Sequence, residues 1–111
     1  MLEINKLPAV LAELITAQND HNSHAFAEVF SNNALVYDEG KEYSGKAAIK
    51  AWNENTNKKY NTHLEPETLQ QKGGEIILTV LVSGTFEGSP IVLEYHVHLE
   101  DSKIVYLNIT G

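Results

Sequence analysis

The residue best placed for acid–base chemistry is Asp38, which follows the apolar stretch Leu35–Tyr37 and precedes the dipeptide Glu39-Gly40. Burial at the end of a strand raises the pKa of a carboxyl group towards the pH at which it can act as a general acid or base. Asp and Gly are also residues that turns prefer. Two interpretations therefore stay open, a solvated turn residue and an acid at the mouth of a pocket.

Two further sets of side chains could contribute to such a site. Tyr95 lies on the apolar side of a predicted strand, and its hydroxyl could donate a hydrogen bond into a cavity. His63 and Glu65 share one side of a weaker strand and could form a His/acid pair, although a register shift of one residue would turn both outward. No Ser-His-Asp triad and no phosphate-binding glycine loop can be assembled from the sequence.

His96 and His98 lie two residues apart on one strand face, flanked by Glu94 and Glu100. A His-x-His pair can bind zinc or another divalent metal, but residues 101–111 contain no further histidine to complete such a site. We interpret this face as the outer side of a sheet, either exposed to solvent or buried in a dimer. We predict neither a metal nor a cofactor. Protonation of the two histidines would then make dimerisation sensitive to pH. The polar residues 20–24 are interpreted as a loop between helices.

The composition excludes several classes of function. The 111 residues carry a net charge of −7, which argues against nucleic acid and anionic membranes as partners. The absence of cysteine excludes disulfides and thiol chemistry. The stretch MLEINKLPAV lacks a signal-peptide pattern, and no apolar run approaches the roughly 20 residues of a membrane span. We expect a soluble cytoplasmic protein that forms a single domain over residues 1–111.

The first half of the chain has helical periodicity, and we expect three helices. Pro8 suits the first turn of one helix, Asn22 or Ser23 can cap the second, and Ser44 can cap the third. The predicted apolar faces comprise Leu7, Val10, Leu11, Leu14 and Ile15 in the first helix, Phe26, Val29 and Phe30 in the second, and Ala48, Ile49 and Trp52 in the third.

The second half changes to a period of two. Residues 75–87, 90–100 and 103–110 are separated by short turn signals, which predicts antiparallel strands joined by hairpins. A weaker strand at about 62–71 contains Pro66, which implies an edge position or a bulge. In the last strand Leu107 faces the interior, while Ile104 and Tyr106 are predicted on the outer face.

Helices followed by an antiparallel sheet indicate an α+β fold. The long strands, and Gly84 inside one of them, favour a strongly curved sheet. We therefore predict a cone-shaped fold, in which three N-terminal helices pack on a strongly curved, mainly antiparallel β-sheet and leave a cavity at the open end.

The stretch HAFAEVFSNNALVYDEGKEYSGKAAIKAW, residues 24–52, resembles the nuclear transport factor 2-like superfamily, which includes ketosteroid isomerases and SnoaL-like polyketide cyclases. The order of elements matches over nearly the whole chain. By this resemblance Asp38 corresponds to the general base of the isomerases, and Tyr95 lies near the position of their oxyanion-hole aspartate. The helix that carries their oxyanion-hole tyrosine has Leu14 at its inward position here, so the chain departs from the isomerases at both donors.

The resemblance implies a cavity that binds a small apolar organic molecule, with Asp38 and Tyr95 as catalytic candidates. The predicted pocket residues are Leu14, Tyr43, Trp52, His63, Val97 and Leu107. One hypothesis is a cofactor-free isomerase, cyclase or hydratase acting on a carbonyl compound. The other is a noncatalytic ligand-binding or dimeric assembly module of the same fold. In both cases we expect a homodimer through the outer face of the sheet.

Overall fold

The structure, a computed structural model, describes residues 6–111 as three helices and six strands. Residues 1–5, on which the expectation of no signal peptide partly rests, lie outside the described residues. The elements are α1 (Ala9–Asn19), α2 (Ser23–Glu28), β1 (Phe30–Asp38), β2 (Lys41–Ser44), α3 (Lys46–Tyr60), β3 (His63–Lys72), β4 (Glu75–Ser83), β5 (Ile91–Glu100) and β6 (Lys103–Thr110).

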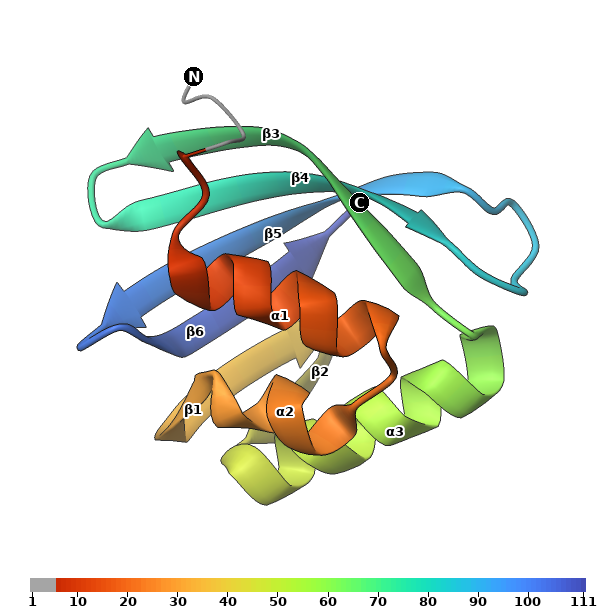
Figure 1. The fold of residues 1–111 in the computed structure, drawn as a ribbon, viewed down its shortest axis with the longest axis horizontal. Helices are drawn as coiled ribbons and strands as arrows, with labels where there is room; N and C mark the ends of the chain where they lie inside the picture. The colour runs from red at the N-terminus through yellow and green to blue at the C-terminus, as the bar shows by residue number, and fades with distance from the viewer. Residues whose placement is uncertain (1–5) are drawn as a thin grey trace.

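The strands form one curved sheet in the order β2-β1-β6-β5-β4-β3, and Figure 1 shows the three helices on one of its faces. Every neighbouring pair is antiparallel except β1 and β6, which are parallel. The sheet is not closed, because β2 and β3 are its edges. The predicted α+β architecture of helices on a curved, mainly antiparallel sheet is therefore confirmed.

The helix starts agree with the sequence prediction at α2 and differ at α3. The side chain of Asn22 accepts a hydrogen bond from the backbone N–H of Ala25 at 3.1 Å and caps α2 as predicted. α3 is preceded by Gly45 at φ +85°, whereas Ser44, the predicted cap, is the last residue of β2. Glycine adopts this left-handed conformation without steric cost, so the backbone rather than a hydroxyl side chain begins α3.

Both features inferred from Pro66 are present. β3 lies at the edge of the sheet, and its register against β4 shifts between Pro66 and Thr68. Proline has no N–H to donate to a neighbouring strand, so an edge with a local irregularity accommodates it. The short strand β2 was not predicted; it pairs with β1 through a two-residue turn at Glu39 and Gly40, both with positive φ.

The alternation of β5 is as predicted, with Tyr95 and Val97 buried, but the prediction for Ile104 is wrong. Ile104 belongs to the core and is fully buried. The register between β5 and β6 shifts between His98 and Leu99, so that Ile104 lies opposite Leu99. This irregularity reverses the direction of the side chain relative to simple alternation along β6.

Gly84 has a different role from the predicted bend within a strand. The strand ends at Ser83, and Gly84 begins the loop to β5. The loop lies against the end of α3, where the N–H of Thr85 donates to the carbonyl oxygen of Tyr60 at 2.7 Å. A Cβ atom on Gly84 would lie 2.3 Å from that same oxygen, so only glycine allows this approach.

The helices and the inner face of the sheet share one apolar core, which includes the fully buried residues Leu14, Phe30, Val97, Ile104 and Leu107. Within residues 6–111 no helix is both long enough and apolar enough to cross a membrane.

We predict that Gly84→Ala lowers the free energy of unfolding by about 1–3 kcal/mol, because the backbone at Gly84 or at Tyr60 must move to make room for the added Cβ atom. Urea denaturation measures the change. Gly74→Ala is the matched control and should have a much smaller effect, since a Cβ atom there meets nothing within 4 Å. Equal stabilities for the two variants would contradict the close approach of the loop to α3.

Candidate functional site

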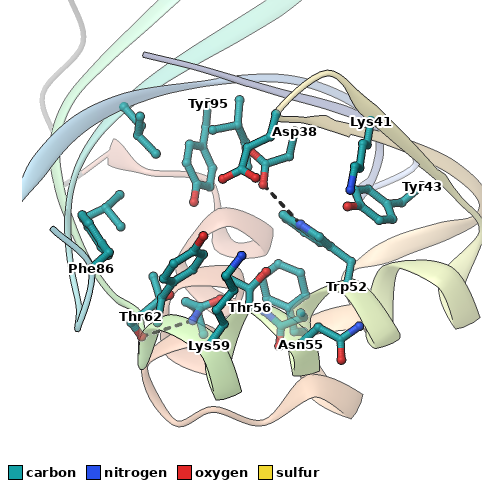
Figure 2. Close-up of a pocket in the computed structure, with 18 of the residues that line it drawn as sticks. Asp38, Lys41, Tyr43, Trp52, Asn55, Thr56, Lys59, Thr62, Phe86 and Tyr95 are labelled. Carbon is teal, nitrogen blue, oxygen red and sulfur yellow. Dashed lines mark hydrogen bonds between the residues drawn. The ribbon is translucent and has the colours of Figure 1, made fainter. Parts of the chain in front are cut away.

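A cavity of about 740 Å³ lies between α3, the inner face of the sheet and the loop that follows β4 (Figure 2). Its volume is within the range of about 300–1,000 Å³ that is typical of small-molecule sites. α3 contributes both small and large side chains to its wall, among them Ala48, Ala51, Thr56, Trp52 and Tyr60.

Asp38 faces this cavity because β1 alternates. Ala34 and Val36 are fully buried on the inner face of β1, and Asp38 is the next residue with the same parity. The tight turn at Glu39-Gly40 follows it and pairs it with Lys41. Asp38 thus ends a strand at a turn and also lines the cavity.

The surroundings of Asp38 favour its protonated form. Burial is the main cause and raises the pKa of the carboxyl group, and the neighbouring negative charge of Glu39 adds to the increase. The indole N–H of Trp52 opposes them by donating a hydrogen bond to Oδ2 of Asp38 at 3.2 Å. The net result is a carboxyl group whose pKa lies above its ordinary value.

Tyr95 supplies a hydroxyl group to the same cavity. Its side chain is 7% exposed, and Figure 2 shows its ring beside Asp38 with the hydroxyl directed into the cavity. Burial raises the pKa of Tyr95, and the negative charge of Asp38 raises it further. The hydroxyl therefore stays protonated and can act as a hydrogen-bond donor.

Aromatic side chains form much of the cavity wall. Trp52 stacks on Tyr43 with 5.6 Å between ring centroids, and it also meets Phe26 at 5.8 Å. At the end of α3, Tyr60 packs edge-on against Phe86 at 5.8 Å. All five line the cavity, which gives it flat apolar surfaces suited to a ring system.

The structure brings four of the predicted site residues together and leaves four elsewhere. Asp38, Tyr43, Trp52 and Tyr95 line the cavity. Leu14, Val97 and Leu107 face inward as predicted, but they lie in the filled part of the core and are fully buried. His63 is exposed at the start of β3 and does not line the cavity. Side chains alternate along β3, and the inward-facing one at this point is Leu64, which is 2% exposed.

The polar part of the lining was not predicted from the sequence. Gln18, Asn53 and Thr62 line the cavity and are buried. A signal for one of them was present, since Asn53 lies four residues after Ile49 on the buried face of α3. Gln18 lies three residues after Ile15, the last residue of the apolar face predicted for the first helix. Two cations, Lys41 and Lys59, also line the cavity at exposed positions.

Three other histidines, His21, His96 and His98, have local partners outside the cavity. On the face of the sheet opposite the helices, Glu75 Oε1 lies 3.6 Å from His96 Nδ1 and 3.5 Å from His98 Nε2. His98 stacks on Tyr106 with 4.5 Å between ring centroids. Within residues 6–111, no group of three or more His, Cys, Asp or Glu side chains has an arrangement that could hold a metal ion. His21 lies 2.9 Å from the carbonyl oxygen of Thr62 and connects the loop after α1 to β3.

Comparison with known proteins agrees with this fold. The family model described as the SnoaL-like domain matches residues 11–107. A proposed polyketide cyclase from Sinorhizobium meliloti is similar, with 29% identity, a TM-score of 0.92, and coverage of 98% of this chain and 100% of that chain. A search of curated proteins found no match.

Two more distant structures share the fold. A hypothetical protein from Catenulispora acidiphila has a ketosteroid isomerase-like fold and was solved in complex with trimethylamine. It has 16% identity, a TM-score of 0.85, and coverage of 96% of this chain and 87% of that chain. The second is SalBIII, an epoxide hydrolase/cyclase-like enzyme in pyran ring formation in the polyether salinomycin. It has 23% identity, a TM-score of 0.77, and coverage of 91% of this chain and 86% of that chain.

We predict that Trp52→Phe raises the pKa of Asp38 further, because it removes the hydrogen bond that stabilises the carboxylate while keeping an aromatic ring against Tyr43. A carboxyl-carbon NMR titration of Asp38 measures the pKa. Tyr43→Phe is the control, since Tyr43 packs on Trp52 through its ring, and it should shift the pKa less. A Trp52→Phe titration with the pKa unchanged or lowered would show that the indole N–H does not stabilise the carboxylate.

Proposed function

Because the chain belongs to the SnoaL-like domain family, we propose that its cavity binds a small, largely apolar carbonyl compound and moves a proton next to the carbonyl group. The likeness to a proposed polyketide cyclase, at 29% identity over nearly the full length of both chains, supports substrates of this type. The observation that carries the proposal is the half-buried carboxyl group of Asp38 beside the buried hydroxyl of Tyr95 on the wall of one cavity.

In this proposal Asp38 acts as the general base. Its carboxylate takes a proton from the carbon next to the carbonyl, and the electron pair of the broken C–H bond moves towards the carbonyl oxygen to form an enolate. The raised pKa of Asp38 makes it a stronger base than an ordinary aspartate and brings its pKa nearer to neutral pH. Asp38 completes an isomerisation by returning the proton to another carbon of the enolate. In a cyclisation the enolate carbon attacks a second carbonyl group of the same substrate, whose C=O π bond breaks, and the resulting alkoxide takes the proton from Asp38; neither route needs a cofactor.

Tyr95 stabilises the negative charge that develops on the oxygen. Its raised pKa keeps the proton on the hydroxyl group, which can then donate a hydrogen bond to an enolate oxygen. Since the hydroxyl is held in a buried site, little reorganisation is needed when the charge forms. Tyr95 would thus provide the donor, near the position at which the ketosteroid isomerases have their oxyanion-hole aspartate.

A second candidate function is a noncatalytic ligand-binding module. The observation in its favour is the hydrogen bond from Trp52 to Asp38, which joins α3 to the end of β1 and gives the carboxyl group a structural role without chemistry. In this alternative the cavity still binds an apolar molecule. Removing the Asp38 carboxylate then changes the affinity for that molecule or the stability of the fold, and there is no reaction rate to change.

We also propose that the protein forms a homodimer through the face of the sheet opposite the helices. This face carries Val92, which is 50% exposed, together with His96, His98 and Tyr106. A mixture of exposed apolar, aromatic and polar side chains is typical of the surface of a protein interface.

Deuterium exchange of α-tetralone tests the chemistry. The protein should accelerate exchange of the hydrogens next to the carbonyl, followed by proton NMR in heavy water. Asp38→Asn should lower the rate about 100-fold or more, and Tyr95→Phe should also lower it, whereas Tyr106→Phe on the outer face should not. The wild-type rate should rise with pH through the raised pKa of Asp38, because the carboxylate is the reactive form. Undiminished exchange by Asp38→Asn would contradict the enzymatic proposal, and bound α-tetralone without exchange would support the module.

Sedimentation velocity tests the dimer. We expect Val92→Glu to convert a dimer to a monomer, because it places charges in the apolar part of the interface. Gln71→Glu is the control, since Gln71 is exposed on the edge strand β3. A monomeric wild-type protein, or a Val92→Glu dimer as tight as the wild type, would exclude this interface.

A further inference from the structure

Every buried polar side chain of residues 6–111 lies at this one cavity. Gln18 is 4% exposed, Asn53 is 1% exposed and Thr62 is 7% exposed, and the remaining buried side chains are apolar. All three line the cavity. Buried polar groups are more informative than buried apolar ones, because each must be hydrogen-bonded or costs free energy.

Two of these residues belong to a closed ring of amide side chains, which we call the amide ring and which comprises Gln18, Asn53 and Asn57. Gln18 Nε2 donates to Asn57 Oδ1 at 2.7 Å, Asn57 Nδ2 donates to Asn53 Oδ1 at 3.2 Å, and Asn53 Nδ2 donates to Gln18 Oε1 at 2.7 Å. Gln18 Nε2 also donates to the carbonyl oxygen of Thr62 at 3.2 Å. The amide ring therefore connects α1, α3 and the residue before β3 through polar contacts.

Two hydrogen-bonding groups of the residues that line the cavity remain after the amide ring is complete. The side-chain amide of Asn53 has two N–H groups, and the hydrogen bonds among residues 6–111 use one of them. The hydroxyl oxygen of Thr62 is buried without any partner in the same part of the chain. Neither group is needed to hold the helices together, since the amide ring and the Thr62 carbonyl already do so. A valine at position 62 would fill the same volume without leaving a hydroxyl unpaired.

We propose that the ligand carries a second oxygen, as a hydroxyl or carbonyl group, which accepts a hydrogen bond from the Asn53 amide and pairs with the Thr62 hydroxyl. Figure 2 shows Thr62 on the opposite side of the cavity from Asp38. Rotation about χ1 can turn the hydroxyl of Thr62 towards such an acceptor. The inference rests on the proposed function and specifies its substrate class as a ring compound with one oxygen at each end.

The positions of the polar groups in the cavity support a ligand with one oxygen at each end. In the proposal Asp38 and Tyr95 handle a carbonyl group at one end, and the aromatic residues Trp52 and Tyr60 also line the cavity. An apolar ketone would leave the Asn53 N–H and the Thr62 hydroxyl unpaired in the complex, and an oxygen at that end would pair them. A site with buried, unpaired polar groups discriminates strongly in favour of a ligand that pairs them.

A matched pair of probes tests the inference. One is α-tetralone, and the other is the hydroxy-α-tetralone that carries its hydroxyl on the ring carbon farthest from the carbonyl. Binding is followed by quenching of Trp52 fluorescence at about pH 6, where a phenol stays protonated. The wild type should bind the hydroxylated probe about threefold to tenfold more tightly than the parent, as expected for one or two net hydrogen bonds.

Thr62→Val should remove most of this preference, and Thr62→Ser should retain it. Thr79→Val, a change on the outer face of β4, is the control and should leave the preference unchanged. Thermal unfolding checks that each variant is folded, and deletion of an unpaired hydroxyl should not lower the stability of the Thr62→Val protein.

The outcomes separate this inference from the proposed function. Equal affinity of the wild type for the two probes, or a preference that survives in Thr62→Val, overturns the second-oxygen subsite and leaves the proton-transfer proposal standing. A preference that depends on Thr62, in a protein that does not exchange the hydrogens of α-tetralone, supports the subsite and overturns the proposed chemistry. Failure to bind either probe overturns both.

Discussion

The site depends on the alternation of side chains along β1 and β5, which turns Asp38 and Tyr95 to the same side of one sheet. β1 buries Ala34 and Val36 on its inner face, so a slip of one residue would expose both and would send Asp38 outward. The core thereby fixes the direction of the carboxyl group. Burial of the apolar residues of β1 stabilises the fold, and the same strand holds Asp38 in partly apolar surroundings, where the pKa of its carboxyl group is raised.

The interior is filled at α1 and hollow at α3. α1 contributes Leu11 and Leu14, and both are fully buried in a filled core. α3 lines the cavity with small side chains such as Ala48 and Ala51 and with the aromatic side chains of Trp52 and Tyr60. Amide side chains, rather than large apolar ones, connect the two helices across the inner end of the hollow. Such a network of hydrogen bonds stabilises the fold when its polar groups are paired. A polar group that stays unpaired can form a hydrogen bond with a ligand.

The sequence predicted the parts of the fold that follow from periodicity. The helices, the antiparallel strands and the inward direction of Tyr95 all follow from the spacing of apolar residues, and the edge position of β3 follows from Pro66. Features that depend on a single residue or on contacts between distant segments were missed. The register shift that buries Ile104 has no local signal, and β2 is only four residues long. His63 was placed in the cavity because the parity of a weak strand could not be fixed without its partner. The amide ring joins residues up to 39 positions apart, so no local pattern marks it.

A crystal structure of the protein soaked with α-tetralone would show both the hollow and the direction of Asp38. We expect the bicyclic ring between Trp52 and Tyr60, with its carbonyl oxygen within hydrogen-bonding distance of the Tyr95 hydroxyl and the adjacent carbon facing the Asp38 carboxyl group. An interior closed by side chains, with Asp38 hydrated by bulk solvent and no ring bound, would contradict this expectation.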